Sequence, residues 1–113
     1  MAYHLKMGTD YTAQQFASAI YSIVTSAVTT TPQDRVYSAA MSTHNLFRDD
    51  FTPELWQRFT KFRMVVTRVD DEKGGSFRAS ANVLTDMEAH DILVDFYNLA
   101  QAVEEEYRCS NAN

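Results

Sequence analysis

The fold class predicted for this chain depends on the stretch RMVVTRVDDEKGGSFRASANV, residues 63–83. Its first seven residues, 63–69, are rich in β-branched side chains, which favour an extended strand. Residues 70–75 end in the glycine pair of the chain and are typical of a turn. Residues 77–83 then alternate apolar and polar side chains, which is the pattern of a half-buried strand. The stretch therefore predicts an antiparallel β-hairpin.

The segment after this hairpin has the clearest helical pattern in the sequence. Thr85 and Glu88 have the spacing of a capping box, in which each side chain accepts a hydrogen bond from the other residue's backbone amide. Apolar side chains then recur every three or four residues along one face: Ala89, Ile92, Phe96, Leu99, Ala100, Val103 and Tyr107. This pattern predicts a long final helix with one buried face.

The N-terminal part of the chain predicts a short strand and a helix. Residues 3–7 alternate apolar and polar side chains, which indicates a strand. A helix is expected to begin at Thr12, which has capping-box spacing to Gln15, and to end at the threonine run of residues 29–31.

Two further helices are predicted between the first helix and the hairpin. Each begins with a Thr-Pro pair, at residues 31–32 and 52–53, because Thr is a favourable N-cap and Pro fits the first helical position. The second of them is expected to end near Phe62. In a competing interpretation this helix continues through Val69, and the hairpin does not form.

Together these elements predict one α+β domain over residues 1–108, with the helices packed on one side of a small antiparallel sheet. Residues 109–113 are expected to form a flexible tail. An all-α bundle is the alternative fold class. The length of 113 residues fits one domain and is too short for a (β/α)₈ barrel or a full dinucleotide-binding fold.

The composition also indicates where the protein resides. Its single cysteine, Cys109, cannot form an intramolecular disulfide, which favours a reducing compartment. The N-terminus has no apolar signal segment, and no apolar run reaches the roughly 20 residues that a membrane span needs. We therefore expect a cytoplasmic protein that has no membrane partner.

No motif in the sequence predicts catalysis, a metal or a cofactor. The side chains that most often act as bases or nucleophiles fall on separate predicted elements: His4, His44, His90 and Cys109. Glu88, Asp91 and Asp95 share a helix face, but three such carboxylates more often form a solvated stripe than a cation site. The glycine pair precedes a predicted strand rather than a helix, so it does not form a phosphate-binding loop.

The net charge of −5 is unevenly distributed along the chain. Residues 58–85 carry six basic and three acidic side chains, whereas residues 86–107 carry seven acidic and no basic ones. On the final helix a second strip of apolar side chains lies among these carboxylates, away from the core face. These features predict a surface for a basic protein partner, formed by Met87, Glu88, Asp91, Val94, Asp95, Tyr97, Glu104, Glu105 and Glu106.

The function predicted from this surface is that of a non-catalytic protein-binding module. One form of it is a stoichiometric inhibitor, of the kind that viruses and mobile elements encode, whose carboxylates cover a basic, nucleic-acid-handling host protein. The sequence also leaves open a homodimer. The alternative is a nucleic-acid-associated protein that uses the basic residues of the hairpin: Arg63, Arg68, Lys73 and Arg78. The acidic tip of the hairpin and the negative net charge weigh against direct nucleic-acid binding.

Overall fold

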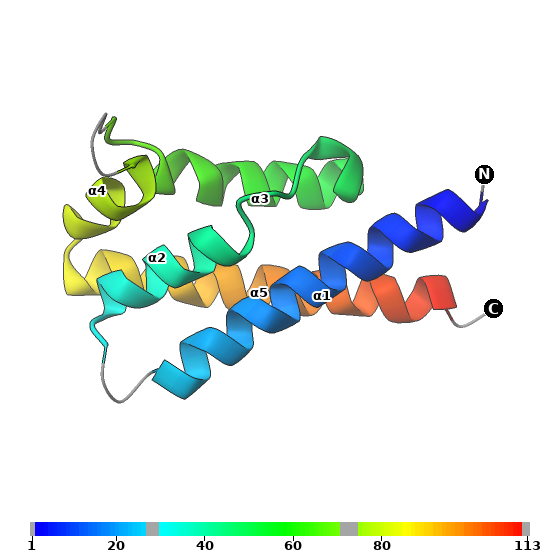
Figure 1. The fold of residues 1–113 in the computed structure, drawn as a ribbon, viewed down its shortest axis with the longest axis horizontal. Coiled ribbons are helices and arrows are strands. Elements are labelled where there is room, and N and C mark those ends of the chain that lie inside the picture. The colour runs from blue at the N-terminus through cyan, green and yellow to red at the C-terminus, as the bar shows by residue number, and fades with distance from the viewer. Residues whose placement is uncertain (1, 27–29, 71–74, 112–113) are drawn as a thin grey trace.

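The chain folds into an all-helical domain rather than the α+β domain that its sequence predicts. The computed structural model describes residues 2–26, 30–70 and 75–111, and within these ranges it contains helices and no strand (Figure 1). The elements in chain order are α1 (Ala2–Ser26), α2 (Pro32–Ser42), the 3₁₀ turn η1 (Arg48–Asp50), α3 (Pro53–Val66), α4 (Ser76–Asn82) and α5 (Asp86–Asn111). The fold class is therefore the all-α alternative.

Helix α5 is the element around which the others are arranged. It packs against α1, α2 and α3, while the short α4 packs against α2 and α3. The two long helices, α1 and α5, cross and run in opposite directions, so the start of α1 lies at the same end of the molecule as the end of α5 (Figure 1). One side of α5 faces away from all of these neighbours.

Aromatic rings from three helices form the centre of the core. The ring of Phe16 in α1 stacks on that of Phe96 in α5, with centroids 5.2 Å apart, and Phe59 in α3 meets Phe16 edge-on at 6.0 Å. The predicted core face of the final helix is confirmed in its main part, since the buried residues are Ala89, Phe96, Leu99, Ala100 and Val103. The other two residues predicted on this face are half-buried: Ile92 and Tyr107.

The first predicted strand, residues 63–69, is wrong because α3 continues past Phe62 to Val66. The buried residues of α3 fall at helical spacing along one face: Leu55, Phe59, Phe62 and Val66. Burial of this face outweighs the modest strand preference of the β-branched residues at its end. The competing interpretation is correct that the helix extends beyond Phe62, but the helix ends before Val69.

The second predicted strand, residues 77–83, is also wrong, because most of it is the helix α4. A strand would turn Val83 inward, but this side chain is 53% exposed. The inward residues have helical spacing instead: Ser80, Ala81 and Leu84 are buried and Phe77 is half-buried. Ser80 is fully buried although it is polar, since its Oγ accepts a hydrogen bond of 2.8 Å from the backbone N–H of Val69.

The turn predicted over residues 70–75 lies mostly in residues 71–74, which are outside the described ranges. Gly75, the residue before α4, has a φ of +86°, a backbone conformation in which a side chain would be strained. Gly75 and the bond from Val69 to Ser80 therefore fix the entry of the chain into α4.

The N-terminal prediction also needs correction. Instead of a strand over residues 3–7 and a helix start at Thr12, the backbone is helical from Ala2 to Ser26. Thr12 lies inside α1, where it is buried, and its Oγ1 donates a hydrogen bond of 2.7 Å to the backbone carbonyl of Asp50 in η1. The hydroxyl that suggested a cap is thus used in a tertiary contact. Residues 27–29, next to the predicted end of this helix, lie outside the described ranges.

The three other predicted helix starts are confirmed. Thr31 and Thr52 are the N-caps of α2 and α3, each followed by Pro at the first helical position. Thr85 and Glu88 form the predicted capping box, in which the Thr85 amide donates to Glu88 Oε1 at 2.9 Å and the Glu88 amide donates to Thr85 Oγ1 at 3.1 Å. The hydrogen bond that the Thr85 amide donates to the Glu88 carboxylate is the largest cause that holds the pKa of Glu88 below its usual value.

Helix α5 extends to Asn111 and so includes the first residues of the segment 109–113. The flexibility of that segment stays a prediction. None of the helices in the described ranges combines the length and the apolar character needed to cross a membrane.

Candidate partner-binding surface

The residues predicted to bind a partner lie on three sides of α5. Four of them lie on the side opposite its buried face: Met87, Asp91, Val94 and Glu105. We call these four residues the outer face. The edge toward α3 carries Glu88, Asp95 and Glu106, and the edge toward α1 carries Tyr97 and Glu104. The structure therefore brings together only part of the predicted set.

The apolar side chains of the set are exposed rather than part of a wide core. Met87 is 76% exposed, Val94 44% and Tyr97 49%. Exposed Met and Tyr side chains are typical of surfaces that bind other proteins.

The acidic side chains of α5 differ in whether they form a hydrogen bond or an ion pair within the chain. Four of the seven have one: Asp86 accepts a hydrogen bond from Gln33, Glu88 from Thr85, Glu106 from Thr52, and Glu104 pairs with Arg108. The other three make no hydrogen bond or ion pair with any residue that the structure describes: Asp91, Asp95 and Glu105. Two of these three belong to the outer face.

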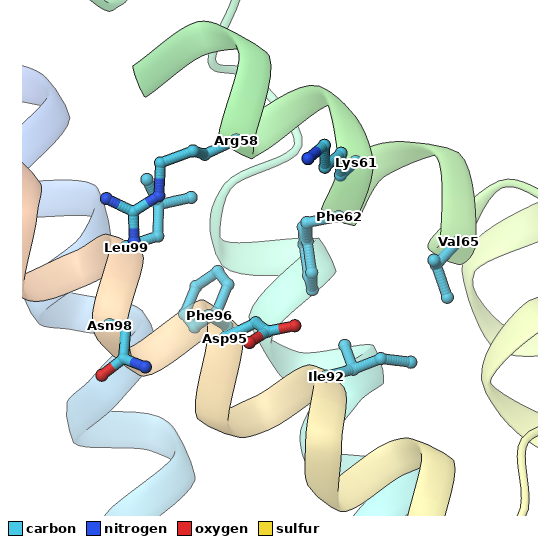
Figure 2. A pocket seen from close by; sticks show the side chains of 9 residues that line it. All are labelled: Arg58, Lys61, Phe62, Val65, Ile92, Asp95, Phe96, Asn98 and Leu99. Carbon is cyan, nitrogen blue, oxygen red and sulfur yellow. The ribbon is translucent and has the colours of Figure 1, made fainter. Parts of the chain in front are cut away.

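Asp95 lines a hollow of about 330 Å³ between α3 and α5 (Figure 2). Arg58 and Lys61 of α3 stand on the other side of this hollow, above a floor that includes Phe62 and Phe96. No ion pair within 4 Å joins Asp95 to either cation among the described residues. Because Arg58 and Lys61 line the same hollow as Asp95, Asp91 and Glu105 are the better candidates for contact with a partner.

The basic residues of the alternative function do not form a ribbon, and two of them are used within the fold. Arg63 donates hydrogen bonds of 3.2 and 3.1 Å to the carbonyls of Thr43 and His44, and its guanidinium lies 4.9 Å from the ring centre of Phe59. Its partial burial lowers the pKa of Arg63 from its usual value. A phosphate would have to compete with these contacts.

Arg78 is also held within the fold. It forms an ion pair of 2.7 Å with Asp34, which lowers the pKa of that carboxyl, and it lies 4.1 Å from the ring centre of Tyr37. Arg68 is exposed near Glu88, and Lys73 lies outside the described residues.

A groove that the sequence does not predict runs between α1 and α5. Its volume is about 700 Å³, and its walls include Tyr21 and Val24 of α1 and Tyr97 of α5. Tyr21 is 71% exposed and Val24 is 66% exposed. The one sequence signal of this groove is the six tyrosines of the chain, since Tyr21, Tyr97 and Tyr107 all line it.

The candidate bases and nucleophiles of the sequence are not brought together among the described side chains. His44 and His90 are exposed on different parts of the fold, and Cys109 is an exposed free thiol near the end of α5. His4 belongs to α1, but its side chain is outside the described part of the structure. Within the described residues, no three His, Cys, Asp or Glu side chains group as a metal site requires.

No protein-family description, curated protein or solved structure matches this chain.

Proposed function

We propose that the protein is a non-catalytic binding module whose outer face on α5 docks a basic protein partner. The observation that carries the proposal is the combination of exposed apolar side chains, Met87 and Val94, with two carboxylates, Asp91 and Glu105, that have no partner among the described residues. Apolar contacts supply binding free energy, while unpaired carboxylates select the charge of the partner.

The electrostatics of α5 favour a basic partner over an acidic one. From Asp86 to Tyr107 the helix carries seven acidic side chains, and the first basic residue after them is Arg108. A surface with one sign of charge accelerates association with an oppositely charged protein, and salt weakens this effect.

In its narrower form, the proposal is that the protein acts as a stoichiometric inhibitor of a nucleic-acid-handling protein. The small size of the chain, its net charge of −5 and the carboxylates along α5 support this form. A surface built to bind phosphates attracts such a row of carboxylates, and occupation of that surface would exclude the nucleic acid. Viruses and mobile elements are the sources in which inhibitors of this type are expected.

The test reverses the outer-face charges with the double variant Asp91→Lys/Glu105→Lys. The matched control is Asp49→Lys/Glu54→Lys, which makes the same charge change at exposed positions of η1 and α3. Both variants should keep the helical circular dichroism of the wild type, because exposed charges contribute little to stability. Each immobilised protein is then exposed to an extract of the source cells at low and at high salt.

We expect the wild type and the control to capture the same basic protein, and the outer-face variant to capture at least tenfold less of it at low salt. Equal capture by the outer-face variant would contradict the proposal. Direct, salt-dependent binding of the purified wild type to DNA or RNA would instead support the alternative function.

A further inference from the structure

We infer that the groove between α1 and α5 is a second docking site, which binds an amphipathic helix of the basic partner. This inference rests on the proposed function and adds the form of the element that the partner inserts. The groove adjoins the outer face, because Tyr97 lines the groove on the edge of α5 toward α1.

The two ends of the groove differ in charge. Phe16 stacks on Phe96 and so sets the register between the antiparallel helices α1 and α5. Tyr21 lies beyond Phe16 toward the C-terminal end of α1, in the direction of the start of α5. Asp10 and Glu104, which both line the groove, lie on the other side of this crossing point. Because the helices run in opposite directions, these two carboxylates meet at one end of the groove.

The dimensions of the groove match three to four turns of helix. On α1 its lining residues extend from Asp10 to Val24, and on α5 from Tyr97 to Tyr107. At a rise of 1.5 Å per residue these walls are about 21 and about 15 Å long. A helix of roughly 10 to 14 residues has the same length and presents anchors at positions i, i+3 or i+4, and i+7.

The floor of the groove allows a close approach. Ala13 and Ala17 of α1, which lie one turn apart, and Ala100 of α5 are among the residues that line the groove. Such small side chains leave room for the larger apolar side chains of a third helix to pack between the two walls.

The charge of the groove selects a basic occupant. Among the side chains that the structure describes, no Lys or Arg lines it, whereas Asp10 and Glu104 do. Glu104 pairs with Arg108, but both side chains are more than half exposed, so the pair holds Glu104 only weakly. A second copy of this chain seated through the same groove would add carboxylates and no described lining cation to neutralise them. The occupant that fits this groove is therefore a partner helix with apolar anchors at one end and Lys or Arg at the other.

The test is a selection from a displayed library of 14-residue helix-forming peptides against the immobilised full-length protein. We expect enriched peptides to carry apolar residues at i, i+3 or i+4, and i+7, with Lys or Arg grouped at one end. Tyr21→Ser/Val24→Ser should weaken the binding of these peptides at least tenfold. Asp10→Lys should remove the preference for the basic group. Met64→Ser, at a similarly exposed position of α3 outside both surfaces, is the matched control and should leave peptide binding unchanged.

In the peptide selection, the inference would be overturned by no enrichment, by enriched peptides that bind Tyr21→Ser/Val24→Ser as tightly as the wild type, or by enrichment of acidic peptides. A homodimer in light scattering that dissociates in the Tyr21→Ser/Val24→Ser variant would also overturn it, since a second copy would then fill the groove. Capture of the intact partner from the cell extract separates the two proposals. If Asp91→Lys/Glu105→Lys loses the partner but Tyr21→Ser/Val24→Ser retains it, the groove inference fails while the proposed function stands. If neither variant loses the partner, the proposed function itself fails.

Discussion

Replacement of Phe16 by Ala should destabilise the domain more than most single changes. The Phe16 ring is 1% exposed and lies against Phe51, Phe59 and Phe96 at centroid distances of 6.1, 6.0 and 5.2 Å. A buried Phe→Ala change costs about 3–5 kcal/mol, because apolar contact is lost and a cavity remains. We expect the upper part of that range, since three ring contacts disappear together.

A loss of this size is large compared with the total stability of a domain, about 5–15 kcal/mol. A loss of about 4–5 kcal/mol corresponds to a fall in the melting temperature of roughly 16–20 °C, at about 4 °C per kcal/mol for a chain of this length. Urea unfolding followed by helical circular dichroism should show a lower midpoint with an unchanged slope, which indicates lost stability rather than a changed unfolded state.

Phe47→Ala is the matched control, because Phe47 is 61% exposed and the same atoms are removed from the surface. It should cost less than about 1 kcal/mol. A Phe16→Ala loss below about 1 kcal/mol, at an unchanged slope, would refute the packing of α1 on α5. The groove that these two helices form would then lose its basis as well.

The remaining predictions concern the ends of α3, α4 and α5. Ser80→Ala should cost about 1–3 kcal/mol in urea unfolding, because the amide of Val69 loses its partner; an unchanged midpoint would contradict this. Phe77→Ala should cost less than Phe16→Ala in the same assay, since Phe77 is only half-buried. Thr85→Ala should cost about 1 kcal/mol through loss of the α5 cap. Because the pKa of Glu88 is lowered, its contribution to stability is present at neutral pH and is lost as the pH falls below the ordinary Glu pKa of about 4.3. The urea midpoint of Glu88→Gln should therefore fall less than that of the wild type as the pH is lowered.

The helix starts could be predicted from the sequence because their causes are local. A Thr followed by Pro, or a Thr three residues before Glu, determines a cap through contacts within one turn. Thr31 and Thr85 accept such cap hydrogen bonds from the amides of Asp34 and Glu88. Helix α3 begins at Thr52 and Pro53 as the sequence places it, although the Thr52 hydroxyl bonds to Glu106 instead. Thr12 misled the prediction because a distant group, the carbonyl of Asp50, uses its hydroxyl.

The hairpin was a false prediction because two periodicities overlap in residues 77–83. Alternation describes Phe77, Ala79, Ala81 and Val83, but the helical spacing also includes Ser80, which a pattern of apolar residues discounts. The buried hydroxyl of Ser80 is satisfied by Val69, a partner that the spacing of apolar residues does not reveal. Tertiary packing thus outweighs local strand preference in this segment.

The candidate site could be predicted in its charge but not in its shape. The excess of acidic residues on α5 is visible in the sequence, whereas Gln33, Thr52 and Arg58 determine which carboxylates have neighbours. The groove depends on the crossing of α1 and α5, which are separated by most of the chain. Its exposed members, Tyr21 and Val24, cannot be distinguished from core residues by spacing alone.

Site-specific photo-crosslinking tests the location of the binding surface most directly. A photo-reactive amino acid replaces Val94 on the outer face or, as the control, Met64 of α3, which is 67% exposed. Both proteins are irradiated in an extract of the source cells. Our account predicts that a basic protein is crosslinked from position 94 and not from position 64. Crosslinking of the captured partner from position 64 alone, or equally from both positions, would contradict it.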